Sequence, residues 1–216
     1  MPGAARYLPV AGVAAVVSVL GCSSDRGTGA ANGDGSGAPA TPRIETVAMI
    51  GDSITVGSED ALRSALQELG VETLAIDAEN GRRMTASGFV GSGTEAAARV
   101  TTRDPDLWVV ALGTNDVGIY DGRDEYRMAI EELLGTIPAG VPLVWVDIHV
   151  DSTPAANDEF NTTLAAALDD RGNATIVNWS AVAAGNGMLS DGIHPSGAGV
   201  EAFAELVSAG VANWLS

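Results

Sequence analysis

The sequence predicts an α/β fold, a three-layer sandwich in which a five-stranded parallel sheet lies between helices. Three observations support this prediction. Segments with the apolar pattern of strands alternate with helix-like segments from residue 44 to the end of the chain. Residues 107–112 are apolar at nearly every position, which is typical of a strand buried on both faces. Polar, glycine-containing segments directly follow several strands, where such sheets bind their ligands.

The individual elements follow from the spacing of the apolar residues. Phe160, Leu164 and Leu168 recur at helical intervals and predict one face of a helix. The predicted strands occupy residues 44–50, 71–76, 107–112, 141–148 and 174–177. The first predicted helix ends at residue 69, and the others occupy residues 94–100, 124–137, 155–168 and 196–215.

The composition excludes some classes of partner. The chain of 216 residues suits one domain with an additional segment at one end. Its net charge is −17, and all 11 basic residues are arginines. Such a surface repels phosphate backbones, so we expect no nucleic-acid partner. We expect the protein to be a monomer.

The first residues have the pattern of an export signal. Arg6 is followed by an apolar run at residues 8–20, which is too short for an ordinary membrane span but suits a signal peptide. The run ends in Val-Leu-Gly-Cys at residues 19–22, which resembles the lipobox of bacterial lipoproteins. The resemblance implies cleavage before Cys22 and attachment of a lipid to its thiol. The alternative is an ordinary signal peptide followed by a free thiol.

The segment after Cys22 predicts a tether. It has no large apolar side chain up to residue 42, so it cannot bury enough surface to offset its ordering entropy. We therefore expect a signal peptide at residues 1–21, a lipidated cysteine and flexible tether at 22–43, and a catalytic domain at 44–216. The protein is expected to be exported and anchored to the outer face of the cell membrane.

Three short segments carry the residue types of a nucleophilic enzyme. They are Gly-Asp-Ser at residues 51–53, Gly-Thr-Asn-Asp at 113–116 and Asp-Gly-Ile-His-Pro at 191–195. A serine hydroxyl is a weak nucleophile and needs an adjacent base, and histidine is the side chain that changes charge near neutral pH. A carboxylate three residues before the histidine can fold back onto the imidazole and orient it. The three segments therefore contain the residue types of a catalytic triad.

These segments, in this order, resemble those of the SGNH (GDSL) hydrolases over residues 44–216. The resemblance implies a flavodoxin-like SGNH hydrolase fold, with Ser53 as nucleophile, His194 as base and Asp191 as its orienting group. It also implies an oxyanion hole made by the backbone N–H of Ser53, a glycine N–H and the side-chain amide of Asn115. Gly81 matches the glycine best, and Gly88 and Gly91 are the alternatives.

Four further residues are candidates for contact with substrate. Arg82, with its neighbour Arg83, could hold an anionic group of the substrate or pair with surface carboxylates. His149 follows a predicted strand at the active edge, although it has no carboxylate at the spacing of the triad. The loop before the final helix carries Trp179 and Met188, which could line an acyl or sugar subsite.

Other polar and aromatic residues have structural interpretations. We expect Asp52 and Asp116 to stabilise their own turns, and Trp108 and Trp145 to lie in the core. The sequence has no cluster of His, Cys and carboxylates with metal-ligand spacing, so we expect neither a metal nor another cofactor.

The sequence favours a serine esterase that cleaves short acyl esters such as acetate. The domain is near the minimum size for this architecture, and residues 82–93 form the only sizeable loop near the site, so we expect an open cleft without a lid. The alternative is an O-acyltransferase, because three segments are similar to SGNH domains that acetylate cell-wall glycans. A third hypothesis is an inactive binding module with the same fold. The three segments that are similar to glycan-acetylating SGNH domains, and so support the acyltransferase alternative, are residues 75–82, 160–164 and 177–179.

Overall fold

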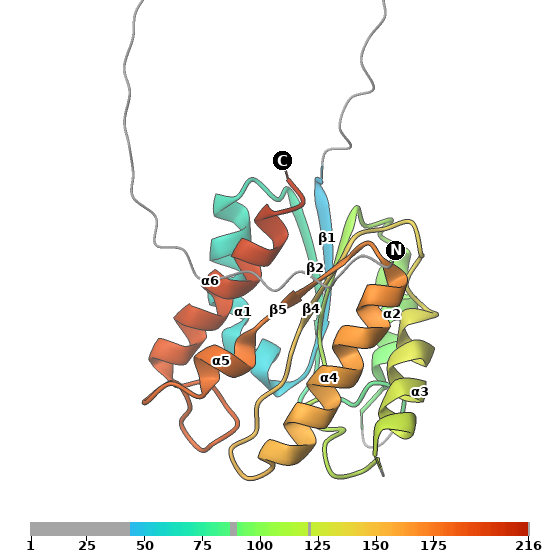
Figure 1. Cartoon of the computed structure of the whole chain (residues 1–216). Coiled ribbons are helices and arrows are strands. Elements are labelled where there is room, and N and C mark those ends of the chain that lie inside the picture. Colours follow the sequence, from blue (N-terminus) through green and yellow to red (C-terminus); the bar gives the residue numbers. More distant parts are fainter. Residues whose placement is uncertain (1–43, 87–89, 121, 216) are drawn as a thin grey trace, which may run out of the picture.

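A computed structural model describes residues 44–86, 90–120 and 122–215 of the chain. Its centre is a five-stranded sheet in the order β2-β1-β3-β4-β5, and every neighbouring pair is parallel (Figure 1). This arrangement confirms the predicted fold class. The strands are β1 (Thr46–Gly51), β2 (Thr73–Ala78), β3 (Leu107–Ala111), β4 (Leu143–Val146) and β5 (Ala174–Val177).

Helices cover both faces of the sheet (Figure 1). Side chains alternate along the strands, so that Val47 and Met49 pack on one layer of helices while Ala48 and Ile50 pack on the other. One layer consists of α1 (Ser53–Glu68), α5 (Trp179–Ala183) and α6 (Gly197–Ala212). The other consists of α2 (Gly93–Thr101), α3 (Arg123–Leu134) and α4 (Pro154–Arg171).

All predicted strands and helices are present, with shifts of a few residues at their ends. The structure adds one helix, α5, that was not predicted. This helix has five residues, too few for apolar spacing to show. It begins because the side chain of Asn178 accepts a hydrogen bond from the backbone N–H of Ala181. The predicted core positions of Trp108 and Trp145 are confirmed, since both side chains are fully buried.

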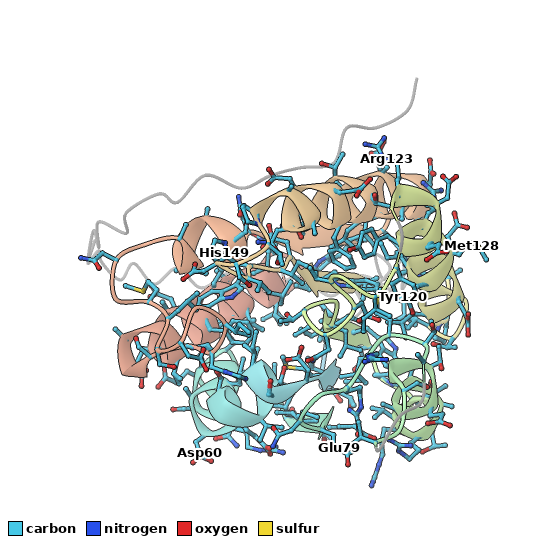
Figure 2. All side chains as sticks on the ribbon, turned by 90° about the horizontal axis from the view of Figure 1, so that it is seen from below. Asp60, Glu79, Tyr120, Arg123, Met128 and His149 are labelled. Carbon is cyan, nitrogen blue, oxygen red and sulfur yellow. The ribbon has the colours of Figure 1, made fainter. Side chains whose placement is uncertain are left out.

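The five strands run in one direction, so their carboxyl ends share one edge of the sheet. Gly51, Ala111 and Val146 end three neighbouring strands there, and Figure 2 looks onto this edge. His149 lies among the loops on one side of the view and Tyr120 on the other. The edge therefore gathers the three segments that the sequence analysis singled out.

Some predictions concern parts of the chain outside the described residues. These are the signal peptide, the lipidated Cys22, the tether and the alternative oxyanion glycine Gly88. None of the helices formed by the described residues combines the length and the apolar character that crossing a membrane requires.

Candidate active site

Ser53 is placed by the start of helix α1. The chain leaves β1 at Gly51, Asp52 caps the helix, and Ser53 is its first residue. The side chain of Asp52 accepts a hydrogen bond of 3.0 Å from the backbone N–H of Ile54. The Ser53 hydroxyl is thereby held at the amino terminus of a helix, where backbone N–H groups and the helix dipole favour negative charge.

His194 lies on a short hairpin just before α6. Leu189 and Pro195 form an antiparallel bridge, and the backbone N–H of Ser190 donates to the carbonyl of His194 at 2.8 Å. Gly192 forms the turn with a φ of +85°, a conformation that residues with a Cβ rarely adopt. The hairpin therefore fixes the backbone on both sides of the imidazole.

Asp191 is folded back within the same hairpin. One of its carboxylate oxygens accepts the backbone N–H groups of Ile193 at 3.0 Å and His194 at 2.8 Å. These bonds to the charged form, with the imidazole of His194 beside it, lower the pKa of the Asp191 carboxyl to about 2. Asp191 is therefore an anion with a fixed orientation at every pH where the protein is expected to work.

The structure brings Ser53, His194 and Asp191 into one line of hydrogen bonds. The Ser53 Oγ lies 3.0 Å from Nε2 of His194, and Nδ1 of His194 lies 2.8 Å from the second carboxylate oxygen of Asp191. Ser53 and His194 are 141 residues apart in the chain. The contacts predicted from sequence are present, with the geometry that a serine nucleophile and its base require.

Asn115 reaches the site from the loop after β3. Gly113 has a φ of +130°, and a Cβ there would lie 2.3 Å from the ring of Phe160, so the loop can pass this point only with glycine. The Nδ2 of Asn115 donates to a carboxylate oxygen of Asp52 at 3.2 Å and to the carbonyl of Arg82 at 3.1 Å. The amide thus joins the segments that follow β1, β2 and β3.

Gly81, the predicted second oxyanion donor, lies in the turn after β2. It is exposed, and its φ of +77° is again a glycine conformation. The next residue, Arg82, supplies the carbonyl that accepts from Asn115. The two predicted donors are therefore neighbours, and their catalytic roles stay predictions.

Arg82 is not available to a substrate, so that prediction was wrong. Its side chain is 1% exposed and donates to the carbonyls of Gly51, Asp77 and Gly91. It also pairs with the carboxylates of Asp77 at 2.8 Å and Glu79 at 3.3 Å. The guanidinium ties together the ends of β1 and β2 and the loop before α2, because its planar set of five donors can meet several acceptors at once.

Asp116 is a second buried carboxylate near the site. Both of its oxygens lie 3.2 Å from the backbone N–H of Met84. Burial raises the pKa of Asp116 to about 7, and burial raises the pKa of Asp52 to about 6. Asp116 therefore connects two loops, and its contact with Met84 is one that the sequence prediction of a role in its own turn did not include.

His149 has a carboxylate partner that the spacing argument missed. Its Nε2 lies 2.9 Å from a carboxylate oxygen of Asp151, only two residues further along the chain. The backbone N–H of Asp151 donates to the carbonyl of Gly192 at 2.9 Å, so this pair borders the hairpin of His194. Contact between His149 and substrate stays a prediction.

Trp179 does not line an open subsite, and that prediction was also wrong. Its indole is 1% exposed and meets the ring of Phe203 edge-on, with centroids 5.2 Å apart. Met188 is half-buried, and its carbonyl accepts from the backbone N–H of Ser196 at 2.8 Å. Met188 therefore attaches the hairpin to the start of α6, while its contact with substrate stays a prediction.

Across the ranges that the structure describes, the His, Cys, Asp and Glu side chains nowhere gather in a group of three that could hold a metal ion.

Known proteins share both the sequence pattern and the fold. The model of the GDSL-like lipase/acylhydrolase family matches residues 49–202. No curated protein matches the sequence. The match to the family model confirms the resemblance predicted from the sequence, and the solved structures below support the fold.

Three similar structures illustrate the range of these proteins. The catalytic domain of peptidoglycan O-acetyltransferase A from Streptococcus pneumoniae is 18% identical with a TM-score of 0.58, over 81% of this chain and 94% of that chain. The protein TesA is 20% identical with a TM-score of 0.64, over 79% of this chain and 99% of that chain. An acetyl xylan esterase from Geobacillus stearothermophilus is 16% identical with a TM-score of 0.56, over 80% of this chain and 94% of that chain.

Proposed function

Because the chain belongs to the GDSL-like lipase/acylhydrolase family, we propose that it is a serine esterase that removes short acyl groups, acetyl above all, through an acyl-enzyme on Ser53. One observation carries the proposal, the unbroken line of hydrogen bonds from Ser53 through His194 to Asp191. This line supplies a nucleophile, a base and a group that orients the base.

In the first half of the reaction, the Ser53 Oγ attacks the ester carbon while Nε2 of His194 takes its proton. The carbonyl electrons move to the oxygen, which becomes an oxyanion. When the carbonyl re-forms, the bond to the alcohol oxygen breaks, and His194 returns the proton to the departing alcohol. Asp191 stabilises the imidazolium that exists between these proton transfers.

In the second half, water replaces the alcohol. His194 takes a proton from the water as its oxygen attacks the acyl carbon, and the proton then passes to the departing Ser53 Oγ. The carboxylic acid leaves, and the free serine is restored. In both halves the oxyanion is stabilised by the backbone N–H groups of Ser53 and Gly81 and by the Asn115 amide, a type of interaction that often contributes most to catalysis.

Exposure of the site supports a short acyl group on a large carrier. The side chains of His194 and Asp191 are 43% and 54% exposed, so a bulky alcohol could reach Ser53 without a lid having to open. A long acyl chain would need an apolar tunnel that excludes water from most of its length. Comparing p-nitrophenyl acetate with p-nitrophenyl palmitate tests this assignment, and faster turnover of palmitate contradicts it.

The same geometry supports a second candidate, an O-acyltransferase that gives the acyl group to a glycan hydroxyl. The exposure of the triad favours it, because a sugar hydroxyl could approach the acyl-enzyme as easily as water does. The similarity to a peptidoglycan O-acetyltransferase domain adds support. An assay with an acetyl donor, in the presence and absence of a glycan acceptor, distinguishes the two candidates by whether acetylated glycan or only acetate accumulates.

We also propose that the enzyme is anchored outside the cell by a lipid on Cys22. The apolar run and the residues before the cysteine support this proposal. Cys22→Ala should move the full-length protein out of the membrane fraction without changing the turnover of a soluble ester. Retention of the variant in membranes contradicts the proposal.

A phosphonate probe directed at serine nucleophiles tests the central assignment. The probe should modify Ser53 alone, as peptide mass mapping would show, and Ser53→Ala should prevent labelling. Heat-denatured protein is the control for nonspecific reaction. Labelling at another serine, or no labelling of the folded protein, contradicts the proposed function.

A further inference from the structure

We propose that Asp52 is a positioning residue for the oxyanion hole, whose carboxylate holds the Asn115 amide with its nitrogen directed at the reaction centre. The inference rests on the proposed function and adds a role to a residue that the sequence assigned to its own turn. It stands on the contacts among the segments that follow β1, β2 and β3.

The two oxygens of Asp52 have separate tasks. One accepts the backbone N–H of Ile54 at 3.0 Å and caps helix α1, and the other accepts Nδ2 of Asn115 at 3.2 Å. The side chain is 1% exposed, so water contributes little to satisfying either oxygen. Asp52 therefore links the helix start that carries Ser53 to the loop that carries Asn115.

The partners of Asn115 determine which way its amide faces. The Asp52 carboxylate and the Arg82 carbonyl are both acceptors, at 3.2 Å and 3.1 Å from the same nitrogen. A flipped amide would place its oxygen against these two oxygens and lose both hydrogen bonds. The contacts thus fix which end of the amide carries the donors before substrate binds, which is the preorganisation that oxyanion stabilisation needs. Both N–H groups are engaged in the free enzyme, so the oxyanion receives the one that otherwise meets the Arg82 carbonyl, while Asp52 keeps the other.

Asp52→Asn separates the two tasks of the carboxylate. A carboxylate offers two acceptor oxygens, whereas an amide offers one and adds a donor group. The variant can therefore satisfy Ile54 or Asn115 but not both, and its own NH₂ would face the amide nitrogen of Asn115 in one of the two orientations. We expect kcat to fall about tenfold or more while KM changes little, because the lost interaction acts on the transition state.

Asp116→Asn is the matched control. It makes the same chemical change at a buried carboxylate one residue from Asn115. The Asp116 oxygens accept from the backbone N–H of Met84 and from the Tyr120 hydroxyl, and an amide with one oxygen and one NH₂ can still meet both groups, because a hydroxyl also accepts. We expect kcat within about twofold of the wild type.

Asp52→Ser guards against failure of the first variant to fold. Serine caps a helix nearly as well as aspartate, but its short hydroxyl cannot also hold Asn115. This variant should keep a thermal transition close to that of the wild type and show the same fall in kcat. Both variants lack the second carboxylate oxygen, which accepts from Asn115. An equal fall in kcat in the two variants would therefore assign the effect to the lost contact with Asn115.

A double-mutant cycle of Asp52→Asn and Asn115→Ala, with kcat measured on p-nitrophenyl acetate, tests whether Asp52 acts through Asn115. If Asp52 acts through Asn115, then Asp52→Asn should add little to the loss already caused by Asn115→Ala. Independent, multiplying losses overturn the proposal, as does unchanged or faster turnover in Asp52→Asn and Asp52→Ser. Failure of the proposed function itself is distinguishable, because the wild type would then neither hydrolyse activated esters nor label at Ser53.

Discussion

The two halves of the site are built in opposite ways. The half that moves protons is an exposed hairpin in which Asp191 and His194 are three residues apart and meet through local hydrogen bonds. The half proposed to stabilise the oxyanion depends on Asp52 and Arg82, which are buried and come from separate loops, and the buried Asp116 lies beside it on a third loop. Local chemistry organises the first half, and tertiary structure organises the second.

The two halves of the site also shift the pKa values of their carboxylates in opposite directions. Backbone N–H groups lower the pKa of the exposed Asp191 to about 2, while burial raises the pKa of Asp52 to about 6 and of Asp116 to about 7. An exposed carboxylate can be held as an anion with little cost to the fold, whereas a buried one needs a donor for each oxygen. We therefore expect substitutions in the hairpin to affect mainly catalysis, and substitutions in the buried network to affect stability as well.

The largest effect tests the exposed half. Ser53→Ala should lower kcat by about 10⁴-fold or more, because the acyl-enzyme cannot form. The thermal transition should stay close to that of the wild type, since the hydrogen bond that the serine hydroxyl makes within the described part of the chain is to the half-exposed His194. Ester hydrolysis and thermal unfolding measure the two quantities.

Ser190→Ala is the control for this prediction. It removes a serine hydroxyl from the same hairpin, one that donates to the carbonyl of His194 at 3.0 Å and not to its imidazole. Turnover should stay within about tenfold of the wild type. Equal losses in the two variants would mean that the hairpin, and not the nucleophile, limits the reaction.

The next largest effect is expected at Asn115, whose amide connects the proposed oxyanion hole with the buried residues behind it. Asn115→Ala should lower kcat about a hundredfold or more, which corresponds to the loss of about 2.7–4 kcal/mol of transition-state stabilisation. Its amide also donates to Asp52 and to the Arg82 carbonyl, so the variant should lose about 1–2 kcal/mol of unfolding free energy as well. Urea unfolding measures the second quantity, and a large kinetic effect without any loss of stability would contradict the buried-network interpretation.

A third prediction concerns stability in the buried half. Arg82→Ala should lower the free energy of unfolding by about 3 kcal/mol, because it leaves three carbonyls and the Asp77 and Glu79 carboxylates without their shared donor. Arg99→Ala is the control, since Arg99 pairs with the same Asp77 but is 53% exposed. That variant should lose less than about 1 kcal/mol. Equal losses would remove the distinction between buried and exposed pairing.

Local sequence determined what could be predicted of the site. The fold class followed from strand and helix periodicity, and the contact of Asp191 with His194 followed from a three-residue spacing. The contact between Ser53 and His194 required the family resemblance as well, since 141 residues separate them. The interpretation of Arg82 failed because charged residues are usually exposed, and only the tertiary structure shows that the ends of β1 and β2 and the loop before α2 surround this side chain. The partner of His149 was missed because a turn, and not a fixed spacing, brings Asp151 to it.

The effect expected per pH unit is smaller, and it separates the two kinds of carboxylate by the pH dependence of the unfolding free energy. A buried carboxyl whose folded pKa lies above its ordinary value near 3.8 binds more protons in the folded than in the unfolded state, so stability falls as pH rises between those values. Asp52 and Asp116 therefore predict that the free energy of unfolding decreases from about pH 4 to pH 7, and Asp116→Asn should reduce this slope by about 1 kcal/mol per pH unit. The lowered pKa of Asp191 acts in the opposite direction, and only below pH 4, so Asp191→Asn should leave the slope between pH 5 and 7 unchanged. Urea unfolding at half-unit pH steps measures the slope in each variant, and a change in Asp191→Asn but not in Asp116→Asn would reverse the assignment of which half titrates with folding.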